Sequence, residues 1–268
     1  MQLPALAQLA KELIKTKQCR FIQPGSSQAS AFNHEDSDPN GRNIDEVFAR
    51  MEESGSWIAL YNVETHPVYR AFLDDVAACF RPLVEPQEPG IFNVGGFIFV
   101  SAPPSVTPFH IDRENNFWLQ VKGRKVMNVW DPTDRVAVPA TVRDDFILYG
   151  GLEEVRLKDG VVQRSHEFDV GPGEGAYFPS TSPHMTRTET SWVKPGDGVS
   201  ISIGVVFYSS VTRRSAYVHA FNRVLRRMGI TPREPNESDT LDRLKFPFGR
   251  LTIWAMRLFG SYRAKTGF

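Results

Sequence analysis

Residues 107–132 read TPFHIDRENNFWLQVKGRKVMNVWDP, and this stretch decides how the rest of the chain is interpreted. Two runs rich in aromatic and β-branched residues, FWLQV and KVMNVW, flank a Lys-Gly pair at 122–123. This pattern predicts two strands joined by a tight hairpin turn. Among the apolar residues stand a histidine, an aspartate, an asparagine and a lysine, at His110, Asp112, Asn116 and Lys125. They need an explanation, because burying an unpaired polar or charged group is costly.

The same strand pattern recurs between residues 91 and 210. Short β-branched and aromatic runs such as FIFV, GAYFP and SISIGVVFY are each bounded by Gly, Pro, Asp or Ser. Several short strands at this spacing indicate a sandwich or barrel made of two sheets. We therefore expect a mainly β core over residues 91–210.

The portions that flank this core read as mostly helical. Residues 1–90 begin with a short helix, which we expect on the surface, and continue with a strand near 57–61 and an amphipathic helix near 68–80. Residues 211–268 form the third portion. Its helical periods fall at 216–229 and 250–260, and each ends in a glycine that suits a helix C-cap.

The composition is that of an ordinary globular protein. Of the 268 residues, 41% are apolar and 23% are charged, so disorder over most of the length is excluded. Two cysteines do not make a disulfide framework, no charged leader precedes an apolar run, and no window approaches the ~20 apolar residues of a membrane span. A cytoplasmic setting is predicted.

A net charge of zero hides an asymmetry between the two parts of the chain. Residues 211–268 contain twelve Lys and Arg against four Asp and Glu, so the remainder is equally acidic. A basic segment could meet nucleic acid, an anionic membrane or an acidic partner, or it could pack on the acidic body or on a second subunit. Its apolar helix faces predict either a homodimer interface or an intramolecular contact with the core.

Strand geometry gives the pair His110 and Asp112 a chemical meaning. Successive side chains in a strand point to opposite faces, so residues two apart share a face. With a histidine from a distant strand they would form the two-histidine, one-carboxylate set that binds Fe(II) and leaves other positions open. His184 is the best candidate, because it closes a turn, a short strand and a Pro-punctuated bend. The remaining histidines read as structural or exposed.

Lys125 has two readings. Alternation places it on one face with Met127 and Val129, so it is either on an exposed outer face or buried beside an anion such as a dicarboxylate cosubstrate. Asn116 could hydrogen-bond a metal-bound carboxylate, and Thr107 could offer a hydroxyl to the same pocket. Each of these two also reads as an ordinary loop or strand residue.

Two blocks of sequence together resemble the Jumonji-C (cupin-like) Fe(II)/2-oxoglutarate oxygenases, and within them the asparaginyl hydroxylase branch acting on hypoxia-inducible factor. The first block is Thr107-Pro-x-His110-x-Asp112 with Asn116-Phe117 and Gln120-x-Lys122-Gly123-x-Lys125, and the second is Pro172-Gly173-Glu174-x-x-Tyr177-x-Pro179-x-x-x-x-His184.

The resemblance implies a double-stranded β-helix (cupin or jelly-roll) core with eight antiparallel strands in two sheets. It implies an oxygenase that hydroxylates a protein side chain, RNA or a small molecule, with Fe(II), 2-oxoglutarate and molecular oxygen. The implied roles follow. Iron binds to His110, Asp112 and His184, and 2-oxoglutarate to Lys125, Thr107, Asn116 and Tyr61. Apart from the resemblance, Trp118, Arg113 and Glu114 flank the triad and could line the substrate entrance, or they could serve only packing and solvation at a sheet edge.

One departure keeps other functions open. The subgroup has a second asparagine on a late strand, where this chain has Ser202 or Gly204. A cupin-like metal-binding module without turnover would fit that loss. A cupin enzyme that uses no 2-oxoglutarate is the third alternative, and Lys125 and Thr107 argue against it.

Overall fold

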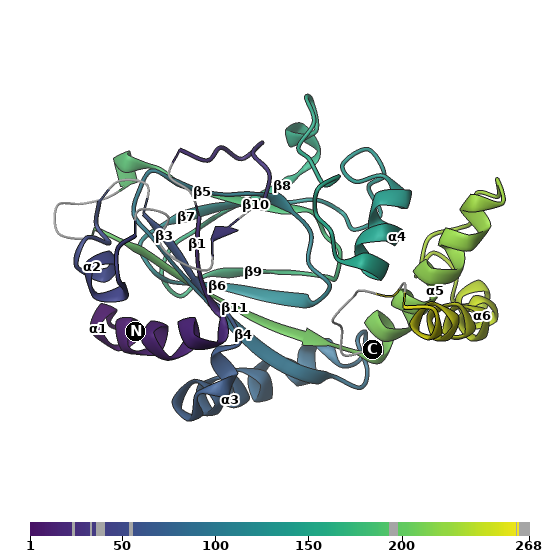
Figure 1. The fold of residues 1–268 in the computed structure, drawn as a ribbon, viewed down its shortest axis with the longest axis horizontal. Helices are drawn as coiled ribbons and strands as arrows, with labels where there is room; N and C mark the ends of the chain where they lie inside the picture. The colour runs from purple at the N-terminus through teal and green to yellow at the C-terminus, as the bar shows by residue number, and fades with distance from the viewer. Residues whose placement is uncertain are drawn as a thin grey trace.

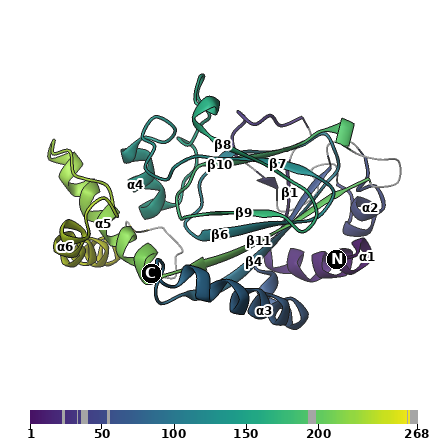
Figure 2. The same ribbon diagram turned by 180° about the vertical axis from the view of Figure 1, so that it is seen from behind.

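The computed structural model describes residues 1–22, 25–32, 34–35, 41–53, 56–192, 198–260 and 262. Two antiparallel sheets lie one over the other, with helices along the outside of the larger sheet and at one end of the molecule (Figure 1). Seen from behind, helices α5 and α6 lie together at the end opposite α1 and α2 (Figure 2).

The strand order is that of a double-stranded β-helix. Strands β4 to β11 divide between the sheets in the orders β4-β11-β6-β9 and β5-β10-β7-β8, and all pairs are antiparallel. The predicted mainly β fold with flanking helices is therefore confirmed. The larger sheet continues through β3 and β1 to β2. In chain order the strands are β1 Cys19–Ile22, β2 His34–Glu35, β3 Trp57–Leu60, β4 Phe92–Ser101, β5 Ser105–His110, β6 Asn115–Lys122, β7 Lys125–Val129, β8 His166–Val170, β9 Gly175–Phe178, β10 His184–Thr188 and β11 Ser200–Tyr208.

The predicted hairpin between β6 and β7 is wrong. A turn does follow Lys122, and Gly123 takes the left-handed conformation with φ +72°. However, β6 pairs with β11 and β9 in the larger sheet, whereas β7 pairs with β10 and β8 in the smaller one. At this turn the chain therefore passes from the larger sheet to the smaller one, so that β6 and β7 face each other from opposite sheets.

The helices are longer than the sequence pattern suggests. Their bounds are α1 Leu3–Leu13, α2 Ile44–Ala49, α3 Pro67–Val84, α4 Ala140–Tyr149, α5 Ser210–Arg227 and α6 Asp239–Leu258. Ser209 starts α5 early, because it forms a capping box with Thr212. Helix α6 runs on through Pro247 and presses against α5 at Gly249, where a Cβ would lie 1.8 Å from the carbonyl oxygen of Tyr217. Only glycine fits that contact.

The main core lies between the larger sheet and the N-terminal helices. Leu6 and Leu9 of α1 are buried against the same cluster as Ile98 of β4 and Ile203 of β11. The expectation of a surface helix is therefore wrong for one face of α1, because residues 1–90 supply part of the core. The three-part division of the chain stays a prediction. No helix in the described part of the chain has both the length and the apolarity to cross a membrane.

Candidate metal centre and its cavity

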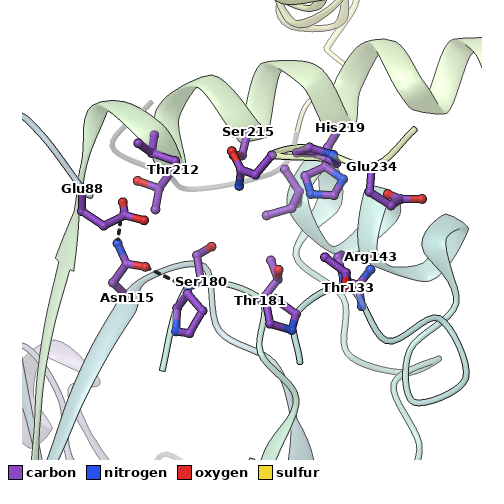
Figure 3. Close-up of a pocket in the computed structure, with 17 residues that line it drawn as sticks. Glu88, Asn115, Thr133, Arg143, Ser180, Thr181, Thr212, Ser215, His219 and Glu234 are labelled. Carbon is purple, nitrogen blue, oxygen red and sulfur yellow. Dashed lines mark hydrogen bonds between the residues drawn. The ribbon is translucent and has the colours of Figure 1, made fainter. Parts of the chain in front are cut away.

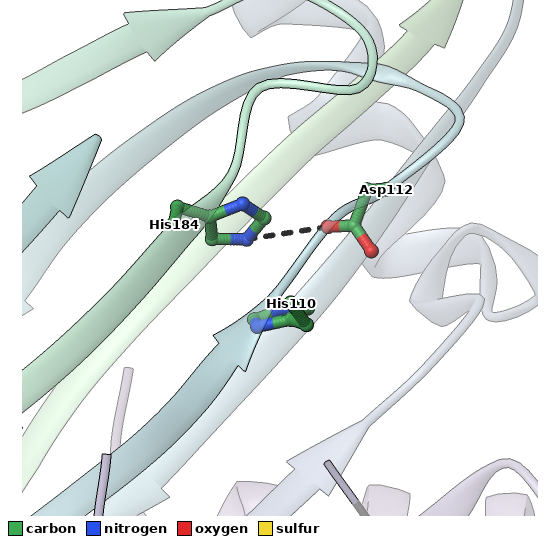
Figure 4. A group of neighbouring side chains, drawn as sticks. All are labelled: His110, Asp112 and His184. Carbon is green, nitrogen blue, oxygen red and sulfur yellow. Dashed lines mark ion pairs between the residues drawn. The ribbon is translucent and has the colours of Figure 1, made fainter. Parts of the chain in front are cut away.

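Three side chains that could bind a metal meet between the two sheets. His110 ends β5, Asp112 follows it by two residues, and His184 begins β10, the neighbouring strand, where its Cα pairs with that of His110. One ligand atom from each lies within 4.8 Å of the others. The Nε2 atom of His184 is 3.4 Å from Oδ2 of Asp112 (Figure 4). The structure thus brings together the three residues that the sequence singled out.

Backbone carbonyls orient both imidazoles. The Nδ1 of His110 is 2.7 Å from the carbonyl oxygen of Pro108, and the Nδ1 of His184 is 3.0 Å from that of Ser182. A carbonyl can only accept, so each Nδ1 carries the proton and each Nε2 presents a lone pair. Histidine ligands of metals commonly have this arrangement, because the outer hydrogen bond fixes both the tautomer and the ring.

The third ligand atom is an ionised carboxylate. Burial opposes ionisation of Asp112, but its interactions with the neighbouring His184 and His110 side chains and with Arg113 outweigh the burial and hold the pKa of Asp112 below its ordinary value of 3.8. Two neutral imidazole nitrogens and one carboxylate oxygen suit a divalent first-row metal such as Fe(II). The donor set therefore fits the metal that the sequence predicts.

A cavity of about 250 Å³ opens beside the three ligands. Eight of the nine predicted site residues line it, and they come from five strands and the segments that follow them. Beyond the three ligands, the predicted residues on its wall are Tyr61, Thr107, Asn116, Trp118 and Lys125.

Lys125 is buried on the inner face of β7. Its side chain is 2% exposed, and its ammonium donates to the hydroxyl of Ser101 at 3.3 Å. Within the described residues no carboxylate forms an ion pair with it. Burial holds the pKa of Lys125 at about 8, against an ordinary value of 10.5. The exposed-lysine reading is therefore wrong, and the cavity contains a cation that lacks a protein anion.

The other polar residues of the wall surround that cation and the ligands. Thr107 lies on β5, and Tyr61 directly follows β3. Burial, and then the charge of Asp112, raise the pKa of Tyr61, so its hydroxyl stays protonated. Asn116 on β6 has a buried Oδ1 without a hydrogen-bond partner in the described part of the chain. Asn116 is a lining residue of the cavity, so its amide lies near a ligand bound there.

Gly204 faces Asn116 across the sheet. A Cβ at Gly204 would lie 3.2 Å from Oδ1 of Asn116, whereas the hydroxyl of Ser202 donates to Gln120 at 2.9 Å. Of the two candidates for the position of the second asparagine, Gly204 is therefore the one beside the site.

Arg113 does not reach the cavity. Its guanidinium donates to the carbonyl oxygens of Phe146 and Ile147 near the end of α4, and it lies over the Phe146 ring at 4.7 Å. The contact between Arg113 and a substrate stays a prediction, and in the structure this side chain contacts the end of α4. This side chain instead closes the C-terminus of a helix, whose last carbonyls lack partners. Trp118, in contrast, lines the cavity and is 3% exposed.

Glu114, which the sequence also places beside the triad, lines the cavity and accepts a hydrogen bond from the hydroxyl of Tyr208 at 2.6 Å. Sequence reasoning did not single out Phe32, another residue of the wall. Phe32 stacks on the His110 ring with centroids 4.1 Å apart, but it comes from a segment without strand or helix periodicity, so no local signal identified it.

Comparison with known proteins gives structural matches alone. No family model matches the chain, and no curated protein matches it. A crystal structure of the Escherichia coli ribosomal oxygenase YcfD matches at 16% identity over 94% of this chain and 58% of that one, with a TM-score of 0.48. A structure of YcfD with cobalt and 2-oxoglutarate matches at the same identity and the same two shares, with a TM-score of 0.46.

A single-residue variant of the oxalate decarboxylase of B. subtilis matches at 16% identity over 67% of this chain and 34% of that chain, with a TM-score of 0.31. The chain thus spans less than three fifths of the length of the YcfD chains that it matches. Identities this low concern the fold alone, and the order of the strands establishes the double-stranded β-helix independently.

Proposed function

We propose that the protein is an Fe(II)- and 2-oxoglutarate-dependent oxygenase that hydroxylates a protein side chain or a small molecule. The observation that carries the proposal is the buried ammonium of Lys125, which shares one cavity with the three metal-ligand candidates and has no protein anion in the described residues. A dicarboxylate satisfies both ends of this cavity, because one carboxylate can chelate the metal while the other pairs with the lysine.

Each residue of the site then has a role. His110, Asp112 and His184 would hold the iron through two Nε2 atoms and a carboxylate oxygen. The bound iron would supply the oxidation of a substrate C–H bond by molecular oxygen, coupled to conversion of 2-oxoglutarate to succinate and carbon dioxide. The remaining roles belong to the cosubstrate site: Lys125, Thr107 and Tyr61 at the distal carboxylate, and Asn116 at the chelating end.

Aromatic side chains keep the site dry. Phe32 covers the His110 ring, and the Phe178 ring lies 4.6 Å from that of His184. Excluding water strengthens the pairing of Lys125 with a carboxylate and protects a reactive oxidant from side reactions. Trp118, on the same wall, would contribute to substrate binding.

Anaerobic visible spectroscopy tests the proposal directly. Fe(II) and 2-oxoglutarate are added to the purified protein separately and together, and the expected result is a weak charge-transfer band that needs both. Lys125→Met is expected to shift this band to a much higher 2-oxoglutarate concentration without weakening Fe(II) binding. Fe(II) binding with no band at any 2-oxoglutarate concentration would exclude the chelating cosubstrate.

A metal-binding cupin-like module without turnover is the second candidate, and Gly204 favours it. Because Gly204 has no side chain, Asn116 is the one amide among the described cavity residues for the chelating end of the cosubstrate. Conversion of 2-oxoglutarate to succinate in the presence of Fe(II) and oxygen separates the two, because a binding module produces no succinate.

Helix α6 is the proposed homodimer interface. Leu244, Leu251 and Leu258 recur every seven residues, and their side chains are 62%, 59% and 65% exposed. A seven-residue apolar repeat is the pattern of two helices packing along a seam, so we propose a second copy of α6 as the occupant. Light scattering is expected to show a dimer for the native chain and a monomer for Leu251→Glu. A monomeric native chain would remove the proposal.

A cytoplasmic location is part of the proposal. Both cysteines are free, with Cys19 buried and Cys79 exposed, which suits a reducing compartment. Retention of the protein with cytoplasmic markers after cell fractionation is the expected result.

A further inference from the structure

The structure contains a second cavity, of about 190 Å³, between α4 and α5 (Figure 3). Neither the metal-ligand candidates nor the proposed cosubstrate residues line it. Two buried titratable side chains of its wall already have ionic partners: His219 bonds Asp144 at 2.7 Å, and Glu234 lies 2.6 Å from Arg226 and 3.5 Å from Arg135. The cavity at the metal centre differs from it, because polar groups of its wall remain without a protein partner in the described chain.

Two threonine hydroxyls face the cavity at the metal centre. Thr107 of β5 and Thr186 of β10 pair across the smaller sheet, line the cavity, and are 8% and 5% exposed. Neither hydroxyl forms a hydrogen bond with the part of the chain that the structure describes, and neither oxygen belongs to the fully enclosed polar atoms that lack a partner there. Both oxygens are therefore reached from the cavity, where a ligand can satisfy them. The proposed function uses Thr107 and leaves Thr186 without a role.

An irregularity in the pairing of β5 with β10 brings both threonines to the face that carries the histidines. His184 pairs with His110 and Thr186 pairs with Thr107, so β5 has one residue more than β10 between these two pairs. In a regular strand, residues three apart would point to opposite faces. The extra residue allows Thr107 and His110 to line the same cavity.

Thr186 lies about one cosubstrate length from the metal-ligand candidate His184. Residues two apart in an antiparallel strand are separated by about 6.8 Å and share a face. An extended chain of five carbons spans about 5 Å, because each of its bonds is about 1.5 Å long. On the neighbouring strand β7, Thr186 lies opposite Met127, so Lys125 is its diagonal neighbour, at a distance that a long side chain can bridge. A ligand that chelates a metal beside His184 can therefore place its far carboxylate between Thr186 and Lys125.

The cavity ends beyond Thr186. The next residue on this face of β10, Thr188, is bonded to Ser105 of β5: the backbone N–H of Ser105 donates to the Thr188 hydroxyl at 3.0 Å, and the two hydroxyls are bonded to each other. Thr188 is buried, and neither of these two residues lines the cavity. Ser101, which accepts from Lys125 at 3.3 Å, is buried as well. These satisfied groups close the far end of the cavity, so a longer ligand finds no room there.

We propose that Thr186 donates its hydroxyl to the distal carboxylate of 2-oxoglutarate, and that the closed end behind it selects a five-carbon dicarboxylate. The inference rests on the proposed function. Three adjacent strands then hold one carboxylate, with Thr107 from β5, Thr186 from β10 and Lys125 from β7. A hydrogen bond to an ionised acceptor is stronger than one between neutral groups, so loss of this hydroxyl is expected to weaken 2-oxoglutarate binding about tenfold.

Calorimetric titration of the Zn²⁺-loaded full chain with four acids tests the proposal. They are 2-oxoglutarate, oxaloacetate with one carbon fewer, 2-oxoadipate with one carbon more, and 2-oxopentanoate, which has five carbons but no distal carboxylate. The native chain is expected to bind 2-oxoglutarate at least tenfold more tightly than each of the other three.

Thr186→Val replaces the hydroxyl with a methyl group of similar size. This variant should bind 2-oxoglutarate about tenfold more weakly and keep its affinity for 2-oxopentanoate within twofold, because only the first acid has a distal carboxylate. Thr186→Ser keeps a hydroxyl and should bind 2-oxoglutarate within threefold of the native affinity. Thr188→Val is the matched control: it removes a hydroxyl that bonds Ser105, so it should lower the melting temperature but preserve the ratio of the two affinities.

Three results would overturn the proposal. They are unchanged 2-oxoglutarate affinity in Thr186→Val, an equal loss of affinity for 2-oxoglutarate and 2-oxopentanoate in that variant, and 2-oxoadipate binding to the native chain as tightly as 2-oxoglutarate. A native chain that binds Zn²⁺ but none of the four acids would refute the proposed function, and this inference with it.

Discussion

Replacing Lys125 with methionine should make the protein more stable and less able to bind 2-oxoglutarate. The pKa of Lys125, about 8 instead of 10.5, means that burial disfavours the ammonium by about 3 kcal/mol. Methionine removes this cost and fills similar volume, while the lost hydrogen bond to Ser101 costs about 1 kcal/mol. At pH 7, without metal or cosubstrate, the free energy of unfolding should therefore rise by about 2 kcal/mol.

The pH dependence of stability gives an independent test of the same residue. Below pH 8 the ammonium is protonated in both the folded and the unfolded protein, so the full cost is present. Between about pH 8 and 10.5 the folded state releases the proton while the unfolded state keeps it, so the free energy of unfolding increases with pH through this window. Lys125→Met should lack this contribution, whereas Lys122→Met, a partly exposed lysine at the same turn, should retain it.

Urea unfolding followed by tryptophan fluorescence at pH 7 and pH 10 measures both effects. Calorimetry with 2-oxoglutarate and a redox-inert metal measures the affinity of Lys125→Met for 2-oxoglutarate. This affinity should fall about 100-fold, since an unpaired buried carboxylate costs about 3 kcal/mol. A Lys125→Met protein that is less stable than the native chain at pH 7, or that binds 2-oxoglutarate unchanged, would refute the reasoning.

Three other substitutions have defined outcomes. Gly204→Ala should weaken 2-oxoglutarate binding about tenfold, since the new Cβ must displace the Asn116 amide, 3.2 Å away; unchanged affinity in calorimetry would mean that the amide is not used. Arg113→Gln should lower the free energy of unfolding by about 2 kcal/mol, because it removes the bonds to α4 and the contact with Phe146, and should leave KM for the substrate unchanged. A raised KM without loss of stability would restore a substrate role. His184→Ala should abolish tight Fe(II) binding in a dialysis assay, and retained stoichiometric iron would contradict the metal centre.

The two cavities differ in how much of each could be predicted from the sequence. Most of the first was predictable, because alternation along β5 and β7 assigns His110, Asp112 and Lys125 to faces once these segments are recognised as strands. The second was not. His219 reads as a structural residue on a basic helix, and only the packing of α4 on α5 brings it to Asp144, 75 residues earlier.

Local sequence identified β3, β4, β6, β7, β9 and β11 and the three metal-ligand candidates, because strand periodicity and turn residues act over a few positions. Tertiary structure alone decided that β6 and β7 belong to different sheets, that Lys125 is buried, that Gly204 rather than Ser202 faces Asn116, and that Arg113 points to α4. These are questions of pairing between distant segments. The periodicity of a strand predicts which residues share a face. Which segment covers that face depends on the packing of the whole chain.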